Sequence, residues 1–276
     1  MPLTDDVIAG LIEAVRQAAR DQILPRFRNL SPDQIDTKTG PEDLVTEADR
    51  AAEAQLTEAA GRLLPGALVV GEEGVAADPG ILDRFATADL AVVIDPVDGT
   101  WNFASGLACF GVILAVVERG RTIFGLLYDP VLDDWILATP SGGAWFCRPG
   151  QAPQRLSGPP ARPRERWQAF VPLSLYASEQ RAAISALSEG YGRAFSLRCS
   201  CHEYRMMAFG HADLMVAPMA KPWDHAAGVL IVQECGGAVW TGGQPGYDPA
   251  APRLPLVVTG RAEEAGEWAA WQGFTQ

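Results

Sequence analysis

The 276-residue sequence predicts an α+β first half followed by a layered α/β second half. Apolar segments separated by short turns succeed one another between residues 111 and 147, which is typical of neighbouring antiparallel strands. Farther along, strand-like and helix-like segments alternate, as in layered α/β proteins. A Pro- and Arg-rich segment at 149–166 separates the two patterns. We therefore expect an N-terminal domain at 1–148 and a C-terminal domain at 149–276.

The first half is expected to contain two long helices and a series of strands. Apolar residues recur at helical spacing over 7–23, with Thr4 as the N-cap and Pro25 ending the pattern. Another helix is expected at 47–64, before Pro65. The strands are expected at 67–70, 90–94, 111–117, 122–128, 135–139 and 142–147.

The second half is expected to alternate between strands and helices. The strands are expected at 169–173, 194–197, 213–217, 238–241 and 255–258. The helices are expected at 178–188, 202–209, 225–235 and 262–271. Gly236 and Gly237 follow the helix at 225–235, as expected for its C-cap.

Composition and charge exclude several classes of protein. The formal net charge of −12 argues against nucleic acid and anionic membranes as partners. Hydrophobic residues make up 48% of the chain, which is enough for a substantial core. No signal peptide is apparent, and no apolar segment approaches the length of a membrane span. We therefore expect a soluble cytoplasmic protein.

The cysteines do not suggest a disulfide framework. There are five of them, at positions 109, 147, 199, 201 and 235. Because their number is odd and their spacing irregular, reduced and mostly buried thiols are expected. A structural zinc site at Cys199 and Cys201 would need more Cys or His ligands at suitable spacing, and only His202 is adjacent.

Residues 94–103 read IDPVDGTWNF and place two acids at the predicted end of a strand. Pro96 and Gly99 favour a turn here, so Asp95 and Asp98 would lie together where the strand ends. Hard cations such as Mg²⁺ prefer oxygen ligands of this kind. If a helix begins at Thr100, its free N–H groups would attract an anion. The alternative is that these residues are simply turn formers.

Other acidic segments occur at similar boundaries, and each has an ordinary structural explanation. Residues 43–49 read DLVTEAD before a helical pattern and fit a capping box. Residues 71–74 read GEEG after a strand and fit a solvated turn. Residues 223–228 read WDHAAG at the start of an apolar helix, where the acid fits an N-cap.

Together and in this order, the acidic segments resemble the inositol monophosphatase family, within the wider group of metal-dependent, lithium-sensitive phosphatases that includes fructose-1,6-bisphosphatase. The resemblance covers residues 38–240. It implies alternating layers of helix, sheet, helix, sheet and helix, with the active site between the two halves. It also implies a homodimer and a cofactor of two or three Mg²⁺ ions.

The resemblance implies a role for individual residues. The implied metal ligands are Glu72, Asp95, the carbonyl oxygen of Val97, Asp98 and Asp224. The implied catalytic residues are Lys38, Asp49, Glu72 and Thr100, of which Thr100 orients the attacking water. The N–H groups of Gly99 and Thr100 are implied to bind phosphate. For Lys38, a solvated lysine of a surface loop is the alternative.

The substrate pocket departs from the family pattern. Ala217 stands where members that cleave inositol phosphates commonly carry a glutamate, seven residues before the Asp of the Trp-Asp motif. Residues 198–205, RCSCHEYR, replace a common Gly-Ser or Gly-Thr pair. The substrate-binding candidates are therefore Arg198, His202, Glu203, Arg205 and Ala217. Arg198 or Arg205 could bind a second anionic group of the substrate, or could instead pair internally with Glu203.

These observations predict a Mg²⁺-dependent phosphomonoesterase that acts on a small soluble phosphate ester. Histidinol phosphate, nucleotide phosphates such as adenosine 3′,5′-bisphosphate, and sugar phosphates all remain open as substrates. A non-catalytic metal- or phosphate-binding regulatory protein is another class of function, although every implied ligand is present. A zinc hydrolase is disfavoured because the acidic segments lack His and Cys ligands.

Overall fold

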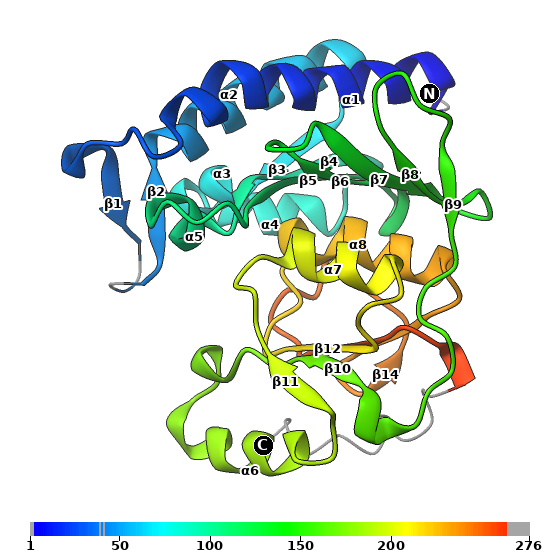
Figure 1. Cartoon of the computed structure of the whole chain (residues 1–276). Coiled ribbons are helices and arrows are strands. Elements are labelled where there is room, and N and C mark those ends of the chain that lie inside the picture. Colours follow the sequence, from blue (N-terminus) through cyan, green and yellow to red (C-terminus); the bar gives the residue numbers. More distant parts are fainter. Residues whose placement is uncertain (1–2, 39, 41, 264–276) are drawn as a thin grey trace.

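Five layers of helix and sheet make up the protein (Figure 1). Helices α1 (Asp5–Ala18) and α2 (Glu47–Leu63) cover the outer face of a seven-stranded sheet. Helices α7 (Ser200–Ala208) and α8 (Pro222–Glu234) lie between this sheet and a six-stranded one. Helix α6 (Ser178–Ser188) lies beyond the second sheet. The expected sandwich of alternating helix and sheet layers is thus confirmed.

The computed structural model describes residues 3–38, 40 and 42–263. The helix expected at 262–271 therefore lies almost wholly outside the described residues. Within the described part, no helix is both long enough and apolar enough to cross a membrane.

The first sheet is antiparallel except at one edge, where β3 and β4 run parallel. Its strands, in spatial order, are β3 (Leu68–Gly71), β4 (Leu90–Asp98), β5 (Gly111–Glu118), β6 (Arg121–Asp129), β7 (Asp134–Thr139), β8 (Gly143–Cys147) and β9 (Gln154–Leu156). All the expected strands of the first half are present. The segment at 149–166, expected to be a connection, contributes β9 to this sheet.

The second sheet mixes parallel and antiparallel pairs. Its strands, in spatial order, are β11 (Arg193–Phe195), β10 (Gln168–Phe170), β12 (Leu214–Ala217), β15 (Leu256–Thr259), β13 (Ala238–Thr241) and β14 (Gln244–Pro245). Strand β10 is shorter than the expected 169–173, because Pro172 and a 3₁₀ turn at Leu173–Leu175 follow it.

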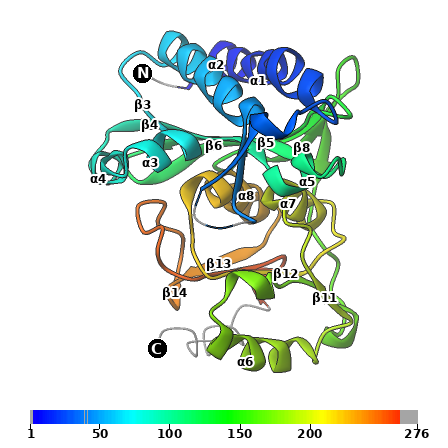
Figure 2. The same ribbon diagram turned by 90° about the vertical axis from the view of Figure 1, so that its left-hand side faces the viewer.

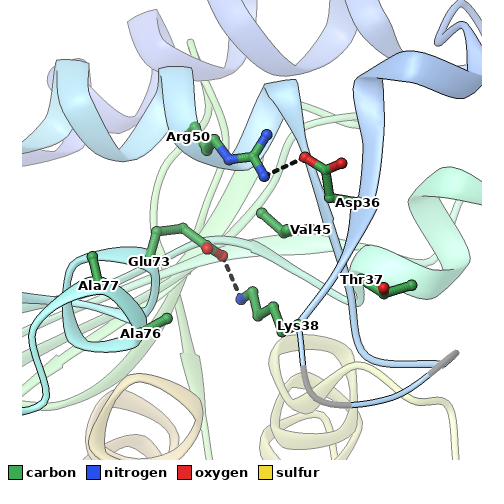
Figure 3. Close-up of a pocket in the computed structure, with 8 residues that line it drawn as sticks. All are labelled: Asp36, Thr37, Lys38, Val45, Arg50, Glu73, Ala76 and Ala77. Atoms are coloured by element: carbon green, nitrogen blue, oxygen red, sulfur yellow. Dashed lines mark hydrogen bonds and ion pairs between the residues drawn. The ribbon is translucent and has the colours of Figure 1, made fainter.

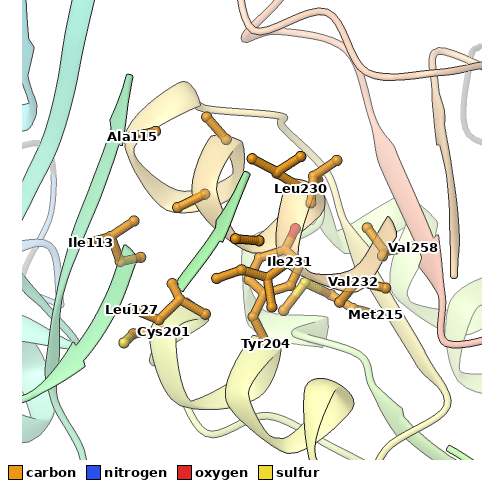
Figure 4. Packing of buried hydrophobic residues seen from close by; sticks show 14 of the residues in the cluster. Ile113, Ala115, Leu127, Cys201, Tyr204, Met215, Leu230, Ile231, Val232 and Val258 are labelled. Atoms are coloured by element: carbon orange, nitrogen blue, oxygen red, sulfur yellow. The ribbon is translucent and has the colours of Figure 1, made fainter. Parts of the chain in front are cut away.

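Alternate side chains of the first sheet pack into different cores. Val92, Ile94 and Val116 point into the core beneath α1 and α2. Ile113 and Leu127 point the other way, into the core that α7 and α8 share with the second sheet (Figure 4). Full burial of such a side chain contributes about 1.5–3 kcal/mol relative to exposure. The nearly continuous apolar runs of the sequence are explained by burial on both faces.

Helix α8 is buried on nearly all sides, which explains why its sequence is apolar all round. It lies close to both sheets, and Gly125 of β6 approaches its backbone so closely that a Cβ there would lie 2.7 Å from the carbonyl oxygen of Ala227. Pro222 occupies its first turn, where no N–H partner is required. The start of α8 is therefore fixed in space.

Several short elements were not expected from the sequence. Strands β1 (Ile35–Thr37) and β2 (Leu44–Thr46) form an antiparallel hairpin. Figure 2 shows this hairpin reaching from the layer of α1 and α2 down to the level of α7 and α8. Helices α3 (Glu72–Ala77) and α4 (Gly80–Phe85) are also short, and α5 (Thr100–Ala104) begins at Thr100, where the sequence analysis considered a helix start. Helices α3 and α4 follow β3, and α5 follows β4.

Candidate metal and phosphate site

The end of β4 presents the first two candidate ligands. The pairing of β4 with β5 shifts register between Asp95 and Asp98, so that a bulge separates the two acids. Gly99 then adopts φ 87°, a left-handed conformation that favours glycine. The turn predicted from Pro96 and Gly99 is therefore present, although β4 extends to Asp98 rather than ending at Ile94.

Asp224 comes from the first turn of α8, far away in the sequence, and meets these acids. One ligand atom from each of Asp95, Asp98 and Asp224 lies within 4.8 Å of the others. Asp95 and Asp98 are buried, and Asp224 is partly exposed. The structure thus brings together three of the expected metal ligands from the two halves of the chain.

The electrostatics of this cluster fit a bound cation. Burial raises the pKa of Asp95, and the nearby carboxylates of Glu72, Asp98 and Asp224 raise it further. Burial and Asp224 likewise raise the pKa of Asp98 to about 7. Buried carboxylates that repel one another are costly unless a cation balances them, and oxygen donors suit Mg²⁺. The residues present therefore fit a hard divalent ion.

Glu72 lies near this cluster but bonds to a lysine. Among the neighbouring carboxylates, Glu72 raises the pKa of Asp95 the most. Its Oε1 accepts a hydrogen bond from Lys38 Nζ at 2.9 Å, and Glu73 Oε1 accepts from the same ammonium at 2.5 Å. These carboxylates outweigh the effect of burial and raise the pKa of Lys38. Lys38 is thus a paired, half-buried cation and not the solvated lysine of the alternative.

A cavity of about 670 Å³ lies beside this lysine. It is lined by Asp36, Thr37, Lys38, Val45, Arg50, Glu73, Ala76 and Ala77. Figure 3 shows Lys38 pointing toward Glu73 and Arg50 pointing toward Asp36 across it. The charged groups around the cavity are therefore paired with one another.

Glu53 positions the segment that carries Glu72, a role that the sequence analysis missed. Its carboxylate is buried and accepts the backbone N–H groups of Glu73 at 2.8 Å and Gly74 at 2.7 Å, in the first turn of α3. The available signal was its position four residues after Asp49, on the same face of α2. An acid on a buried helix face requires a partner.

The hydroxyl of Thr100 lies within hydrogen-bond distance of two acceptors. Its Oγ1 lies 3.0 Å from Asp49 Oδ1 and 3.0 Å from the carbonyl oxygen of Val97. Asp49 is fully buried, its other oxygen accepts the N–H of Thr46 at 2.8 Å, and burial raises its pKa to about 7. The expected capping box of Thr46 and Asp49 is also present. Asp49 therefore completes the N-terminal capping box of α2 and also offers an acceptor to the Thr100 hydroxyl.

The expected phosphate-binding turn is tightly enclosed. A Cβ on Gly99 would lie 2.9 Å from the carbonyl oxygen of Cys109 and 3.1 Å from Cys199 Cβ. Asn102 Nδ2 donates to the carbonyl oxygens of Cys109 and Leu197, each at 2.8 Å. The turn at Gly99–Thr100 is thus held against the second half of the chain.

The segment that replaces the family's Gly-Ser or Gly-Thr pair binds Asp98. The N–H groups of Ser200 and Cys201 donate to its carboxylate at 3.1 and 2.5 Å, and the Cys199 thiol donates at 3.0 Å. Asp98 thereby caps the N-terminus of α7. This contact was not predicted, because the two segments lie about 100 positions apart.

The structure places Glu203 and Arg205, two of the substrate-binding candidates, inside the protein. Glu203 is buried and accepts hydrogen bonds from Leu197 N at 2.7 Å and Ser196 Oγ at 3.0 Å. Arg205 is also buried, and it pairs with Asp134 instead of with Glu203. Both groups are engaged inside the protein because an unpaired charge there would be costly.

The remaining substrate candidates differ in their placement. His202 is partly exposed, and its Nε2 lies 3.0 Å from the carbonyl oxygen of Phe110. Ala217 ends β12 and is buried. Arg198 is exposed beside α5, with its guanidinium over the ring of Trp101. Arg198 is therefore the candidate most accessible to a substrate.

Lys221 is a further cation near the site that the sequence analysis missed. It is the residue immediately before α8. Asp224 raises the pKa of Lys221, with smaller contributions from Glu72, Asp43 and Asp95. A lysine next to the Trp-Asp motif was the available signal.

Comparisons with known proteins identify the family to which the chain is similar. The family model described as "Inositol monophosphatase family" matches residues 3–271. A fructose-1,6-bisphosphatase/inositol-1-monophosphatase of Thermotoga maritima is 30% identical over 210 residues, covering 75% of each chain. The Nus factor SuhB of Escherichia coli K12 is 30% identical over 237 residues, covering 83% of this chain and 85% of that protein.

A solved structure extends the likeness to the fold. Inositol monophosphatase II of Staphylococcus aureus MSSA476 matches with a TM-score of 0.79 at 22% identity, over 96% of this chain and 95% of that one. At this level of identity the match concerns the fold alone.

Proposed function

The chain belongs to the inositol monophosphatase family, and from this premise we propose that it is a Mg²⁺-dependent phosphomonoesterase acting on a small soluble phosphate ester. Family membership supports a metal-dependent phosphatase in general. The observation that carries the proposal for this chain is the convergence of Asp95, Asp98 and Asp224 beside the turn at Gly99–Thr100. Carboxylates and free backbone N–H groups are what a metal ion and a phosphate require.

In the proposed mechanism, two or three Mg²⁺ ions would be held by Glu72, Asp95, Asp98, Asp224 and the carbonyl oxygen of Val97. When bound, such ions lower the pKa of water and balance the charge of the phosphoryl group. The single proton of Thr100 Oγ1 is directed to Asp49 or to the Val97 carbonyl oxygen, both at 3.0 Å. Its lone pairs are left to accept a hydrogen bond from the attacking water and so orient it.

The chain's own groups also bind the phosphate. The N–H groups of Gly99 and Thr100 are proposed to donate to its oxygens. Lys38, which bonds to Glu72 and Glu73, would add positive charge at the same end of the site. Because these groups are fixed before the substrate arrives, little reorganisation is needed during the reaction.

The proposed substrate is a class of small phosphate esters and not one compound. The absence of a carboxylate at Ala217 disfavours a sugar hydroxyl as the main recognition element. Histidinol phosphate and nucleotide bisphosphates are therefore kept as alternatives to inositol phosphates. The partners proposed are a small phosphate ester and a second copy of the chain in a homodimer. The cytoplasmic location and the domain division at residue 149 remain predictions.

A non-catalytic role is the competing proposal, because one relative carries the name Nus factor SuhB. Release of inorganic phosphate from phenyl phosphate distinguishes the two. We expect release with Mg²⁺ that stops when EDTA removes the metal. A purified, folded protein that binds Mg²⁺ but releases no phosphate from any ester would favour the non-catalytic role.

A further inference from the structure

Arg198 is held rigidly beside the phosphate-binding turn. It lies between β11 and α7 with φ 55°, a left-handed conformation that is uncommon for a non-glycine residue. Its N–H donates to Ser196 Oγ at 3.0 Å. Its carbonyl oxygen would lie only 3.3 Å from a Cβ on Gly99. The backbone of Arg198 therefore abuts the turn expected to bind the scissile phosphate.

The side chain of Arg198 is oriented by an aromatic ring. Its guanidinium carbon lies 4.1 Å from the centroid of the Trp101 ring, in the residue that follows Thr100. Stacking of this kind restricts the guanidinium while leaving its N–H edge available for an oxyanion. The ordered arginine can thus bind an anion with little loss of side-chain entropy.

A carboxylate of the protein occupies part of this edge. Glu42 Oε2 lies 3.1 Å from Arg198 Nη1, and Glu42 belongs to the β1–β2 connection that also carries Lys38. The Glu42 side chain is 68% exposed and that of Arg198 is 37% exposed. Exposed pairs contribute little to stability, so another anion can replace Glu42 readily.

Two other cations near the site, Lys38 and Arg205, are held in ion pairs by carboxylates less exposed than Glu42. Lys38 is paired with Glu72 and Glu73, and Arg205 is paired with the buried Asp134. Arg198 has only the exposed Glu42 as an ion-pair partner among the described side chains. Its backbone adjoins the turn expected to bind the scissile phosphate, and its side chain is exposed to solvent.

We propose that Arg198, stacked on Trp101, binds a second anionic group on the leaving-group side of the substrate, and that Glu42 occupies this position until the substrate arrives. This inference rests on the proposed phosphatase function. It narrows the substrate class to phosphate esters that also carry a carboxylate or another phosphate. Neutral sugar phosphates and inositol monophosphates are then poorer substrates.

The test compares phenyl phosphate with carboxyphenyl phosphates and phenylene bisphosphates, the latter two as 3- and 4-isomers. Phosphate release gives kcat and KM for the native protein and for Arg198→Ala, Arg198→Lys and Glu42→Gln. The control is Arg155→Ala, which removes another arginine stacked on a tryptophan, 6.0 Å from the centroid of the Trp145 ring. Comparing the carboxylates with the bisphosphates identifies the kind of anion.

We expect the native protein to prefer at least one ester with a second anionic group over phenyl phosphate in kcat/KM. Arg198→Ala should reduce this preference about 10- to 100-fold, mainly through KM, because the contact is present in the ground state and the transition state alike. Arg198→Lys should retain part of the preference, and Glu42→Gln should increase it. Arg155→Ala should leave it unchanged.

The proposal is overturned if the preference is absent from the native protein or survives Arg198→Ala. An equal loss for all esters would also overturn it, because Arg198 would then be structural. If Arg198→Ala does not fold, Arg198→Lys decides: a preference equal to that of the native protein overturns the proposal, and a reduced one supports it. Absence of hydrolysis of every ester, phenyl phosphate included, would instead contradict the phosphatase function.

Discussion

Glu53 accepts a hydrogen bond from the backbone N–H of Glu73 at 2.8 Å, and this contact ties α2 to the first turn of α3. The space for the Glu53 carboxylate exists because residue 71 is glycine: a Cβ there would lie 2.2 Å from Glu53 Cδ. Glu72, an expected metal ligand, lies between Gly71 and Glu73 in the sequence. The orientation of Glu72 is therefore set by a carboxylate that does not itself belong to the acidic cluster.

We predict that Glu53→Gln weakens Mg²⁺ binding by about tenfold, as substitutions of outer partners of metal ligands commonly do. The amide keeps one acceptor but turns an NH₂ group toward a backbone donor, which should also cost about 1–3 kcal/mol of stability. Titration calorimetry and urea unfolding would measure the two effects. Glu58→Gln, at an exposed position of the same helix, is the control. Unaltered Mg²⁺ affinity in a folded Glu53→Gln protein would remove this positioning role.

Asp95→Asn is expected to abolish activity while stabilising the metal-free protein. Loss of a metal ligand should lower phosphate release by more than about a hundredfold, since even outer partners of ligands cost 10- to 100-fold. Because the neighbouring carboxylates raise the pKa of Asp95, removing its charge relieves repulsion when no cation is bound.

Thermal unfolding in EDTA and phosphate release with Mg²⁺ would measure both effects of Asp95→Asn. Asp89→Asn, at an exposed position before β4, is the control. Native-like phosphate release by the Asp95→Asn protein would exclude Asp95 from the mechanism.

Two helical glycines should respond oppositely to replacement by alanine. Gly61 in α2 has open space around its Cβ position, so Gly61→Ala should stabilise the protein by about 0.5–1 kcal/mol through helix propensity. A Cβ on Gly228 in α8 would lie 2.1 Å from Tyr204 Cδ2, so Gly228→Ala should destabilise it by about 1–3 kcal/mol. Urea unfolding of both variants tests the packing of the middle layer. Equal effects of the two changes would contradict the described contact between α7 and α8.

Stability should fall with rising pH because of Glu203. Burial raises its pKa to about 8 from an ordinary value of 4.5, so the folded state keeps a proton that the unfolded state loses. Between about pH 5 and 8 this group therefore reduces the free energy of unfolding by up to about 1.4 kcal/mol per pH unit. Glu203→Gln should flatten this dependence, and the exposed Glu165→Gln should not. The idea fails if Glu203→Gln retains the native slope in urea unfolding at pH 5.5 and 7.5.

Long elements with a clear period were predictable from the sequence. The helical spacing over 7–23 corresponds to α1 and to the π-helical turn at Ala19–Ile23 that continues it, and the apolar runs of the first sheet correspond to β3–β8. Short elements such as β1, β9 and α3 were not predictable, because a strand or helix of a few residues is stabilised by tertiary contacts rather than by its own pattern.

The candidate site was likewise predictable only in part from the sequence. The spacing of Asp95 and Asp98 around a forced turn predicted their proximity, and the family resemblance supplied Asp224 as the distant third partner. The partners of Glu203 and Arg205 could not be predicted. Asp134, which pairs with Arg205, lies 71 positions away in the sequence, and nothing in the local pattern connects the two.

The burial of α8 between the two sheets has a consequence for how the protein can diversify. Asp224 lies in the first turn of α8, and this helix cannot shift without disturbing both sheets. Heat inactivation should therefore coincide with global unfolding instead of preceding it by local melting. New substrate preferences would more readily arise at exposed side chains such as Glu42 and Arg198, which can change without moving the helix that carries this carboxylate.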